Sequence, residues 1–339
     1  MSPACACTAT ITLVRSTGLT SFASGHTTPR VVHPTHGIYC TSSSNTTHGI
    51  QFPSLLYTRL ATNAPRRYKD VFWTTHKQPG YPSDYGTGVS EPFSELEAVV
   101  SVYTAGPVSA GDGFGFTNNS LLAMTCTAAG TLLKPSWPAV PIDEYHLQRA
   151  TGNGGPDGEF NYAPSVVPSP QGGCADGTQR WVGFYSMDLK AAYNVNISRI
   201  FDSALCRGRP EQFVYRTPLT ATATVQLVSG ARTVTLAACG KADYHLFTVT
   251  TAGSPNALTL LGEVGKFVAV SPVRFTEIQA STAKGQARLQ VSVAGDVDET
   301  VTIMYAKPTS VGAASVAVGT ASCTIDATGT CTIHATEML

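Results

Sequence analysis

The sequence predicts an all-β protein in which a jelly-roll-like β-sandwich is followed by a smaller immunoglobulin-like β-sandwich. Short runs in which apolar and polar residues alternate recur along most of the chain. Alternation with a period of two is typical of strands that bury one face. Loops rich in Gly and Pro separate these runs, as expected where turns join many short strands.

The clearest alternation lies in residues 288–305. Apolar residues occupy every second position on both sides of the polar loop 295–300, namely Leu289, Val291, Val293, Val301, Ile303 and Tyr305. This pattern predicts a β-hairpin with one buried face. Burying each side chain contributes about 1.5–3 kcal/mol, and two strands alone are only marginally stable in water. A second sheet must therefore cover the hairpin, which predicts a sandwich.

Composition divides the chain into three parts. Residues 1–50 contain no Asp, Glu or Lys but include scattered apolar anchors, which predicts an extended N-terminal arm lying along a neighbouring surface. Residues 51–252 are predicted to form the jelly-roll-like domain, and residues 253–339 the immunoglobulin-like domain. The peptide 252–256, which contains Gly and Pro, is typical of a hinge between them.

In the larger domain we expect strands at 54–60, 69–75, 99–103, 121–127, 180–187, 220–228, 232–238 and 244–250, a number that suits a jelly roll. Ser94 and Glu97 have the spacing of a capping box, so residues 95–102 are either the start of a helix or, given their valines, part of a strand. Residues 188–205 have the best helical spacing. The Gly- and Pro-rich residues 151–177 predict a long loop without helix or strand.

The C-terminal domain is predicted from short strands that recur about every ten residues. Besides the hairpin, they cover 257–261, 266–270, 274–280, 315–318, 321–326 and 330–335. Asp326 and Gly329 bound a predicted type I turn with Gly at the left-handed position. Cys323 and Cys331 flank this turn, and the sequence leaves open whether they face each other. In a chain without an export signal, we expect two buried thiols rather than a disulfide.

Charge is scarce on this chain. Asp, Glu, Lys and Arg make up 13% of the residues, with 22 acidic against 22 basic, about half the share usual in soluble domains. A neutral, charge-poor surface favours association, so we expect much of it to be buried against other copies of the chain. No apolar run approaches about 18 residues, so no membrane span is expected. The N-terminus does not resemble a signal peptide.

The sequence carries no catalytic signature, and we predict neither catalytic nor cofactor-binding residues. It contains no Gly-x-Ser-x-Gly elbow, no phosphate-binding loop and no Cys-x-x-Cys pair. The glycines in residues 111–116 lack the context of a dinucleotide fingerprint and predict a loop followed by a strand. An enzyme is therefore not expected.

Two pairs of residues are candidate metal ligands. His33 and His36, with Cys40 nearby, have donors that zinc prefers, but a fourth ligand is missing. Asp143 and Glu144 either join oxygens of a neighbouring copy around a structural Ca²⁺ or cap the short segment that ends at Arg149.

Nucleic-acid contacts are expected to be few, because binding phosphates needs concentrated Lys and Arg. The local basic clusters are Arg66, Arg67 and Lys69, and Arg207 with Arg209. If the protein encloses a genome, contacts are expected there. The alternative is that these are ordinary solvated charges.

In order, the chain has a neutral arm, an eight-strand β domain, a short hinge and a small terminal sandwich. This layout resembles the coat proteins of small non-enveloped icosahedral viruses, in which a jelly-roll shell domain precedes a protruding domain. The resemblance implies a structural protein of the virion that self-assembles into a closed shell, with the terminal sandwich facing a host receptor or glycan. Such coat proteins often carry an Arg/Lys-rich arm for RNA, whereas residues 1–50 contain only Arg15 and Arg30, which leaves open a minor capsid or spike role.

Two other classes of protein remain open. An extracellular or cell-surface adhesin, or a carbohydrate-binding β-sandwich protein, would have a similar Thr-, Ser- and Gly-rich composition. It is favoured if the sequons at Asn45, Asn118 and Asn196 are glycosylated, or if most cysteines are paired. A β-sandwich hydrolase is favoured if carboxylates, or His146 and His245, converge in one cleft.

Overall fold

The computed structural model describes residues 71–78, 90–170, 174, 176–197, 212–220, 222–228, 233–252, 256–307 and 316–338. Within these ranges the chain forms three α-helices and fourteen strands. The strands form antiparallel sheets, so the prediction of an all-β protein is confirmed. The N-terminal arm and the expected strand at 54–60 lie outside the described residues.

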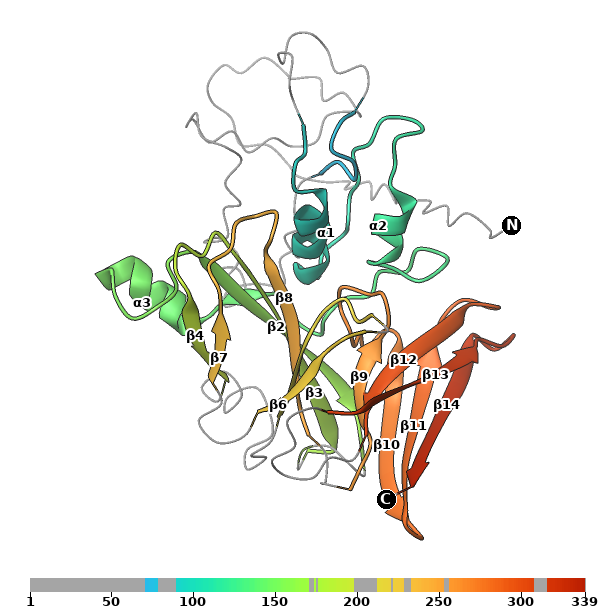
Figure 1. Ribbon diagram of the computed structural model, residues 1–339. Helices are drawn as coiled ribbons and strands as arrows, with labels where there is room; N and C mark the ends of the chain where they lie inside the picture. Colours follow the sequence, from blue (N-terminus) through green and yellow to red (C-terminus); the bar gives the residue numbers. More distant parts are fainter. Residues whose placement is uncertain are drawn as a thin grey trace, which may run out of the picture.

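Six strands form the largest sheet (Figure 1). In spatial order they are β1 (Val140–Pro141), β2 (Glu159–Pro168), β3 (Thr178–Met187), β8 (His245–Thr251), β5 (Gln212–Arg216) and β6 (Val225–Val228). A two-stranded sheet of β4 (Tyr193–Asn196) and β7 (Thr233–Leu236) shares a hydrophobic core with one face. α1 (Ser94–Tyr103) shares a core with the other face. The strands predicted at 180–187, 232–238 and 244–250 are confirmed as β3, β7 and β8.

Each face of this sheet buries aromatic side chains. On the side of β4 and β7, the ring of Phe184 stacks on that of Phe247, with centroids 4.9 Å apart. On the side of α1, Tyr103 meets Tyr185 edge-on with centroids 5.6 Å apart. Gly183 allows this close approach, because a Cβ at this position would lie 2.3 Å from the Tyr103 hydroxyl oxygen.

The C-terminal strands form two three-stranded sheets that share one hydrophobic core. One sheet contains β10 (Phe275–Ala283), β11 (Gln286–Ala294) and β14 (Thr330–Met338), and the other contains β13 (Val318–Thr324), β12 (Thr300–Ala306) and β9 (Thr259–Glu263). This is a β-sandwich, as the alternating pattern predicts.

The predicted hairpin of residues 288–305 is wrong in its pairing. β11 pairs with β10 and β14, whereas β12 pairs with β13 and β9. The six predicted apolar side chains are all buried in the same core, but they reach it from opposite sheets. Alternation identifies which side chains point inward, but not which strand is the neighbour. The polar loop 295–299 therefore crosses between sheets instead of closing a hairpin.

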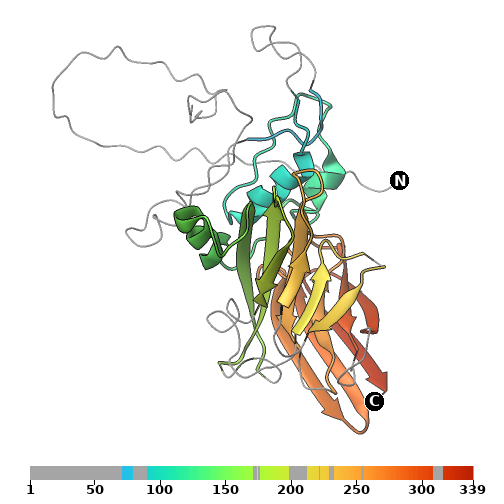
Figure 2. The ribbon, with the colours of Figure 1, turned by 60° about the vertical axis from the view of Figure 1, so that its left-hand side comes forward.

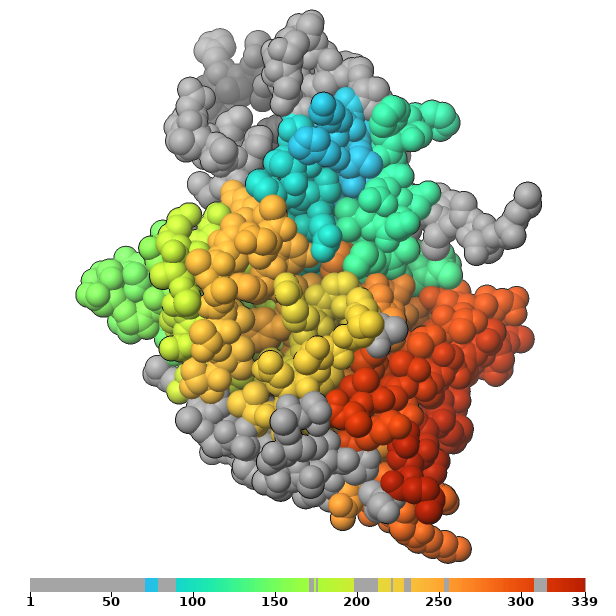
Figure 3. Space-filling model, viewed as in Figure 1, coloured from blue at the N-terminus to red at the C-terminus, as the bar shows by residue number. Residues whose placement is uncertain are grey.

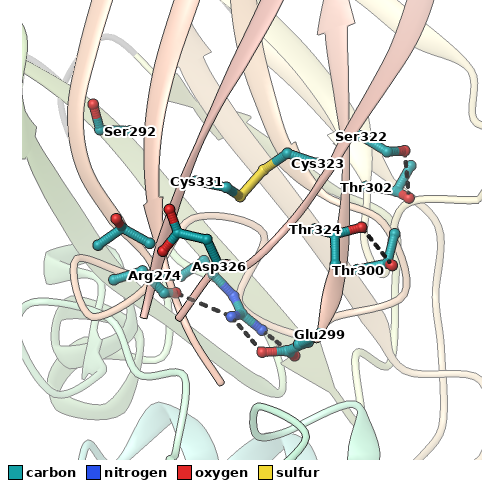
Figure 4. Close-up of a disulfide and its surroundings, with 12 residues drawn as sticks. Arg274, Ser292, Glu299, Thr300, Thr302, Ser322, Cys323, Thr324, Asp326 and Cys331 are labelled. Atoms are coloured by element: carbon teal, nitrogen blue, oxygen red, sulfur yellow. Dashed lines mark hydrogen bonds and ion pairs between the residues drawn. A yellow bond between two sulfur atoms is a disulfide. The ribbon is translucent and has the colours of Figure 1, made fainter. Parts of the chain in front are cut away.

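A buried arginine holds the crossing loop (Figure 4). Arg274 is 0% exposed, and its Nε donates to Glu263 Oε2 at 2.9 Å. Its two terminal nitrogens donate to Glu299 at 2.8 and 2.6 Å. Burial raises the pKa of Glu299, but the hydrogen bonds and charge of Arg274 outweigh it and hold this pKa below its usual value. The ion pairs thus join the end of β9, the start of β10 and the crossing loop.

Replacing Arg274 should be among the most damaging single changes in the fold. Arg274→Met leaves the buried Glu263 and Glu299 without their cation, so we expect a loss of about 3–5 kcal/mol in the free energy of unfolding. Urea denaturation measures it. Arg288→Met, on the solvent-facing side of β11, is the control and should change stability by less than about 0.5 kcal/mol. Equal effects of the two variants would contradict the central role of Arg274.

A disulfide joins the two sheets of the sandwich (Figure 4). Cys323 on β13 is bonded to Cys331 on β14, with Cα atoms 6.2 Å apart, so the expectation of two thiols is wrong. The Asp326–Gly329 turn carries the chain from one sheet to the other, and both cysteines pack against the common core. Cys174 is also disulfide-bonded, while Cys126 and Cys239 are buried thiols.

Two segments in which strands were predicted form helices. Residues 95–102, where the sequence allowed helix or strand, belong to α1, and the strand expected at 99–103 is therefore wrong. The strand expected at 121–127 is also wrong, because these residues begin in α2 (Asn119–Ala123). Asn118 caps that helix, its Oδ1 accepting a hydrogen bond from Leu121 N at 3.1 Å, which favours helix over strand at this point.

Other segments differ in the opposite sense. In the described part of the helix predicted over 188–205, residues 193–196 form β4, where pairing with β7 outweighs helical spacing. The loop predicted over 151–177 contains β2. Pro164 is tolerated there because it faces the edge away from β3, where its O accepts from Ser136 N at 3.0 Å and no strand needs its missing N–H. The strand predicted at 266–270 is wrong, because residues 267–270 form bends. Lys266 Nζ donates to Ala123 O and Cys126 O, both at 2.7 Å.

Side chains on both sides of the predicted hinge share hydrophobic cores. Val167 and Trp181 of the large sheet pack in the core of the C-terminal sandwich, and Trp181 Nε1 donates to Leu260 O at 3.0 Å. The two halves of the described chain are therefore tightly packed, and the domain boundary at 252 stays a prediction. None of the helices in the described ranges is long and apolar enough to cross a membrane.

Candidate contact surface

A loop formed by residues 110–118, here called the Phe114 loop, is held against residues 71–78 (Figure 1). Phe72 and Ala110 form a parallel bridge, and Gly111 N donates to Phe72 O at 2.8 Å. Thr75 Oγ1 donates to Phe116 O at 3.2 Å. Two segments about forty residues apart in the sequence thus support each other.

The Asp112 carboxylate is the centre of the hydrogen bonds that hold the loop. Its oxygens accept from Thr74 N at 2.7 Å and from Thr74 Oγ1 at 2.6 Å. They also accept from Gln78 Nε2 at 2.9 Å, while Gln78 Oε1 accepts from Gly113 N at 2.6 Å. Hydrogen bonds to a charged acceptor are stronger than neutral ones, so the loop has a defined shape.

This fixed loop presents aromatic side chains to solvent. Phe116 N donates to Gly113 O at 3.0 Å and closes a turn with Phe114 and Gly115 at its centre. Gly115 has φ +82, a conformation that favours glycine. Phe114 is fully exposed (104%), and Phe116 is 43% exposed. Val71 lies next to Gly111 of this loop: its Cβ would be 3.4 Å from a Cβ placed on Gly111. Its side chain is 50% exposed and lies beside the loop.

A pre-shaped loop that carries an exposed aromatic ring has the properties of a contact surface. Burying a phenylalanine side chain contributes about 1.5–3 kcal/mol, and a rigid loop loses little conformational entropy when it docks. While the ring is exposed to water, it contributes no burial free energy to the isolated fold. The loop and residues 71–78 lie on the side of the molecule away from the tip of the C-terminal sandwich (Figure 3).

Sequence reasoning found the loop but missed this role, and the predicted strand after it is wrong because α2 follows. The signal was present in the sequence of residues 111–116, which places Phe114 between two glycines and Phe116 directly after the second. A tight Gly-rich turn lies at the surface, so an aromatic residue at its centre is not expected to be buried.

Asp112→Ala should loosen the Phe114 loop. The substitution removes three acceptor interactions, so amide hydrogens of residues 111–118 should exchange with solvent at least about tenfold faster, as expected for a local loss of 1.4 kcal/mol or more. Hydrogen exchange with mass spectrometry measures this. Asp298→Asn, on an exposed turn of the C-terminal sandwich, is the control and should leave the exchange of the loop unchanged. Unchanged exchange in Asp112→Ala would mean that the carboxylate does not hold the loop.

A second polar cluster surrounds Glu159 at the start of β2. Burial raises the pKa of Glu159 from 4.5 to about 7; Arg149 and Lys241 oppose the shift, and Asp188 adds to it. Lys241 Nζ lies 3.9 Å from Asp188 Oδ2. A carboxyl that titrates near neutrality suits general acid–base chemistry, so this cluster is the strongest point in favour of the hydrolase alternative.

The described residues around Glu159 add no metal site or cleft to this carboxyl. In the described part of the chain, no three His, Cys, Asp or Glu residues are placed to hold a metal ion. Glu159 does not line the cavity of about 10 Å³ beside Tyr103, Ser165 and Thr248, which has room for about one water molecule. His245 Nε2 lies 2.9 Å from Ala237 O.

Glu159 should make stability depend on pH. Because its pKa is higher in the folded chain than in the unfolded chain, its contribution to stability is complete below about pH 4.5 and is lost as the pH rises through about 7. Glu159→Gln should therefore unfold at a higher temperature than the parent at pH 8, by roughly 2–4 °C per kcal/mol gained, and lose this advantage at pH 5. Thermal unfolding at both pH values measures this. A parallel shift at both values, as expected for the control Asp298→Asn, would contradict the assignment.

The structure describes only some of the predicted site residues. Asp143 and Glu144 lie in the first turn of α3 (Asp143–Thr151), where carboxylates interact favourably with the helix dipole. The N-cap residue is Ile142. His146 is on the same helix. The metal candidates His33 and His36, and the basic candidates Arg66, Arg67, Lys69, Arg207 and Arg209, lie outside the described residues.

Neither a scan against protein-family models nor a search of curated proteins finds a match to this sequence.

Proposed function

We propose that this chain is a structural protein that self-assembles, with other copies of itself, into a closed shell. The observation that carries the proposal is the Phe114 loop, in which the Asp112 hydrogen bonds fix the backbone while Phe114 remains fully exposed. A monomer gains nothing from such an arrangement. Between copies, the ring becomes a buried anchor of the kind that dominates binding energy.

The surface composition supports association. Only 13% of the residues are charged and the net charge is zero, so neither desolvation of charge nor mutual repulsion opposes contact between copies. The layout of the chain resembles that of icosahedral virus coat proteins, and the proposal therefore extends to a virion. A shell of this kind would bind nucleic acid through few direct contacts, for which Arg66, Arg67, Lys69, Arg207 and Arg209 are the candidates.

In this proposal the C-terminal sandwich faces outward. The outer side of its β12–β13 pair carries hydroxyl groups. Across this pair, Thr302 Oγ1 and Ser322 Oγ lie 2.8 Å apart and share a hydrogen bond (Figure 4). Short polar side chains of this kind remain hydrated without charge. A receptor or glycan would be met on this side.

A cell-surface adhesin is the second candidate, and the disulfides favour it. Three of the five described cysteines are disulfide-bonded, and disulfides persist mainly in oxidising compartments. The sequon at Asn118 lies on the exposed Phe114 loop. An adhesin would remain a monomer or small oligomer and would bind glycan or a cell surface, whereas a shell protein would form large closed particles.

Phe114→Ser tests the shell proposal. In sedimentation velocity at micromolar concentration, the parent chain should form large discrete particles, and the variant should sediment mostly as smaller species because it loses an anchor contact. Met338→Ser removes another exposed apolar side chain, 77% exposed at the end of β14, and this variant should still assemble. A parent chain that sediments as a stable monomer would overturn the proposal.

A further inference from the structure

We propose that α2 couples the C-terminal sandwich to the Phe114 loop, so that the shape of the contact surface depends on a closed sandwich. α2 lies between the two in both ribbon views (Figures 1 and 2). The consequence for assembly rests on the proposed function, because it concerns the Phe114 contact. The coupling itself is a property of the single chain and can be measured without particles.

α2 begins in the hydrogen-bond network of the Phe114 loop. Asn118, the last residue of the loop, is the N-cap of α2, and its backbone N–H donates to Thr74 Oγ1 at 2.7 Å. The same hydroxyl of Thr74 donates to Asp112 Oδ2 at 2.6 Å. Leu121 of α2 and Phe72 of the supporting segment are buried in one hydrophobic cluster. A shift of α2 would therefore move the groups that hold the loop.

The other end of α2 is held by the turn between β9 and β10. Lys266 Nζ donates to Ala123 O and to Cys126 O, both at 2.7 Å. Phe267 N donates to Met124 O at 3.1 Å. The last carbonyls of a helix have no partner within it, and a charged donor makes the stronger hydrogen bonds. Because a helix of five residues is not stable alone in water, α2 depends on this support from the sandwich.

The crossing loop between β11 and β12 provides a second support, just beyond α2. Ala128 N donates to Glu299 Oε1 at 3.2 Å, and Ala129 N donates to Asp296 Oδ2 at 2.6 Å. Glu299 is itself held by the buried Arg274. The ion pairs that join the strands of the sandwich therefore also place an acceptor for the segment that follows α2.

These contacts join parts of the chain that are made at different times. The hydrogen bonds of Lys266, Glu299 and Asp296 to the α2 segment span 140 to 171 residues. Residues 259–338 are synthesised after residues 71–139, and a chain folds progressively from its N-terminal side. Coupling through α2 would leave the contact surface loose until the sandwich has folded, so that chains assemble after folding and not before.

Hydrogen exchange with mass spectrometry tests the coupling in the Phe114→Ser background, where the chain stays unassembled. Lys266→Met removes both hydrogen bonds to α2, so exchange at residues 111–118 should become at least about tenfold faster. Lys284→Met, on the exposed turn between β10 and β11, is the matched control and should change it by less than about twofold. Exchange in β8 should be the same in both variants. Faster exchange confined to α2, with residues 111–118 unchanged, would overturn the proposal.

A second variant decides the matter if Lys266→Met does not fold. Asp296→Ala removes the acceptor of Ala129 N and should speed exchange at residues 111–118 at least about threefold, whereas Asp298→Asn should not. Coupling between two sites is reciprocal, so Asp112→Ala in the loop should speed exchange at residues 127–131. No change at residues 111–118 in the first variant, or at residues 127–131 in the last, would contradict the coupling.

Sedimentation with Phe114 in place measures the consequence for assembly. Lys266→Met should need at least about tenfold more protein than Lys284→Met to form particles, because its anchor loop is no longer pre-shaped. Equal particle formation by the two variants would overturn this consequence. A parent chain that forms no particles contradicts the proposed function but leaves the exchange results intact, whereas particles together with unchanged exchange contradict the coupling alone.

Discussion

The buried guanidinium of Arg274 is the interaction on which the C-terminal half depends. It is held by Glu263 at the end of β9 and by Glu299 in the loop between β11 and β12. Glu299 also accepts a hydrogen bond from Ala128 N at 3.2 Å, so the same carboxylate reaches the segment after α2. Because an isolated charge cannot remain buried, these three partners must come together for the sandwich to close. The Cys323–Cys331 disulfide then joins the sheets through β13 and β14.

Much of the class and core of this fold could be predicted from the sequence, but the neighbours of each strand could not. The side chains of Leu289, Val291 and Ile303 were identified as buried because alternation determines the face of a strand. Whether a polar loop closes a hairpin or crosses between sheets depends on contacts distant in the sequence, such as the one that Arg274 makes with Glu299 of the loop. The cysteines were misjudged for the same kind of reason, since their approach depends on two strands lying in opposite sheets.

The candidate surfaces were harder to predict than the core. The loop that exposes Phe114 is held by hydrogen bonds between Asp112 and residues 74–78. No local sequence pattern predicts a contact between segments that are so far apart in the chain. For Asp143 and Glu144 the sequence left open a Ca²⁺ site or a cap, and the structure places both in the first turn of α3. The Phe114 loop is rigid and exposed, and the proposal of association with other copies rests on it. Glu159 shows that one titratable group in a packed sheet is not sufficient evidence for an enzyme.

The central claim is that this chain is a building block whose exposed rigid elements are buried by other copies. An electron micrograph of the purified, full-length chain tests this claim most directly. The account predicts closed particles of uniform diameter. A field of separate compact molecules, unchanged as the protein concentration is raised, would contradict it.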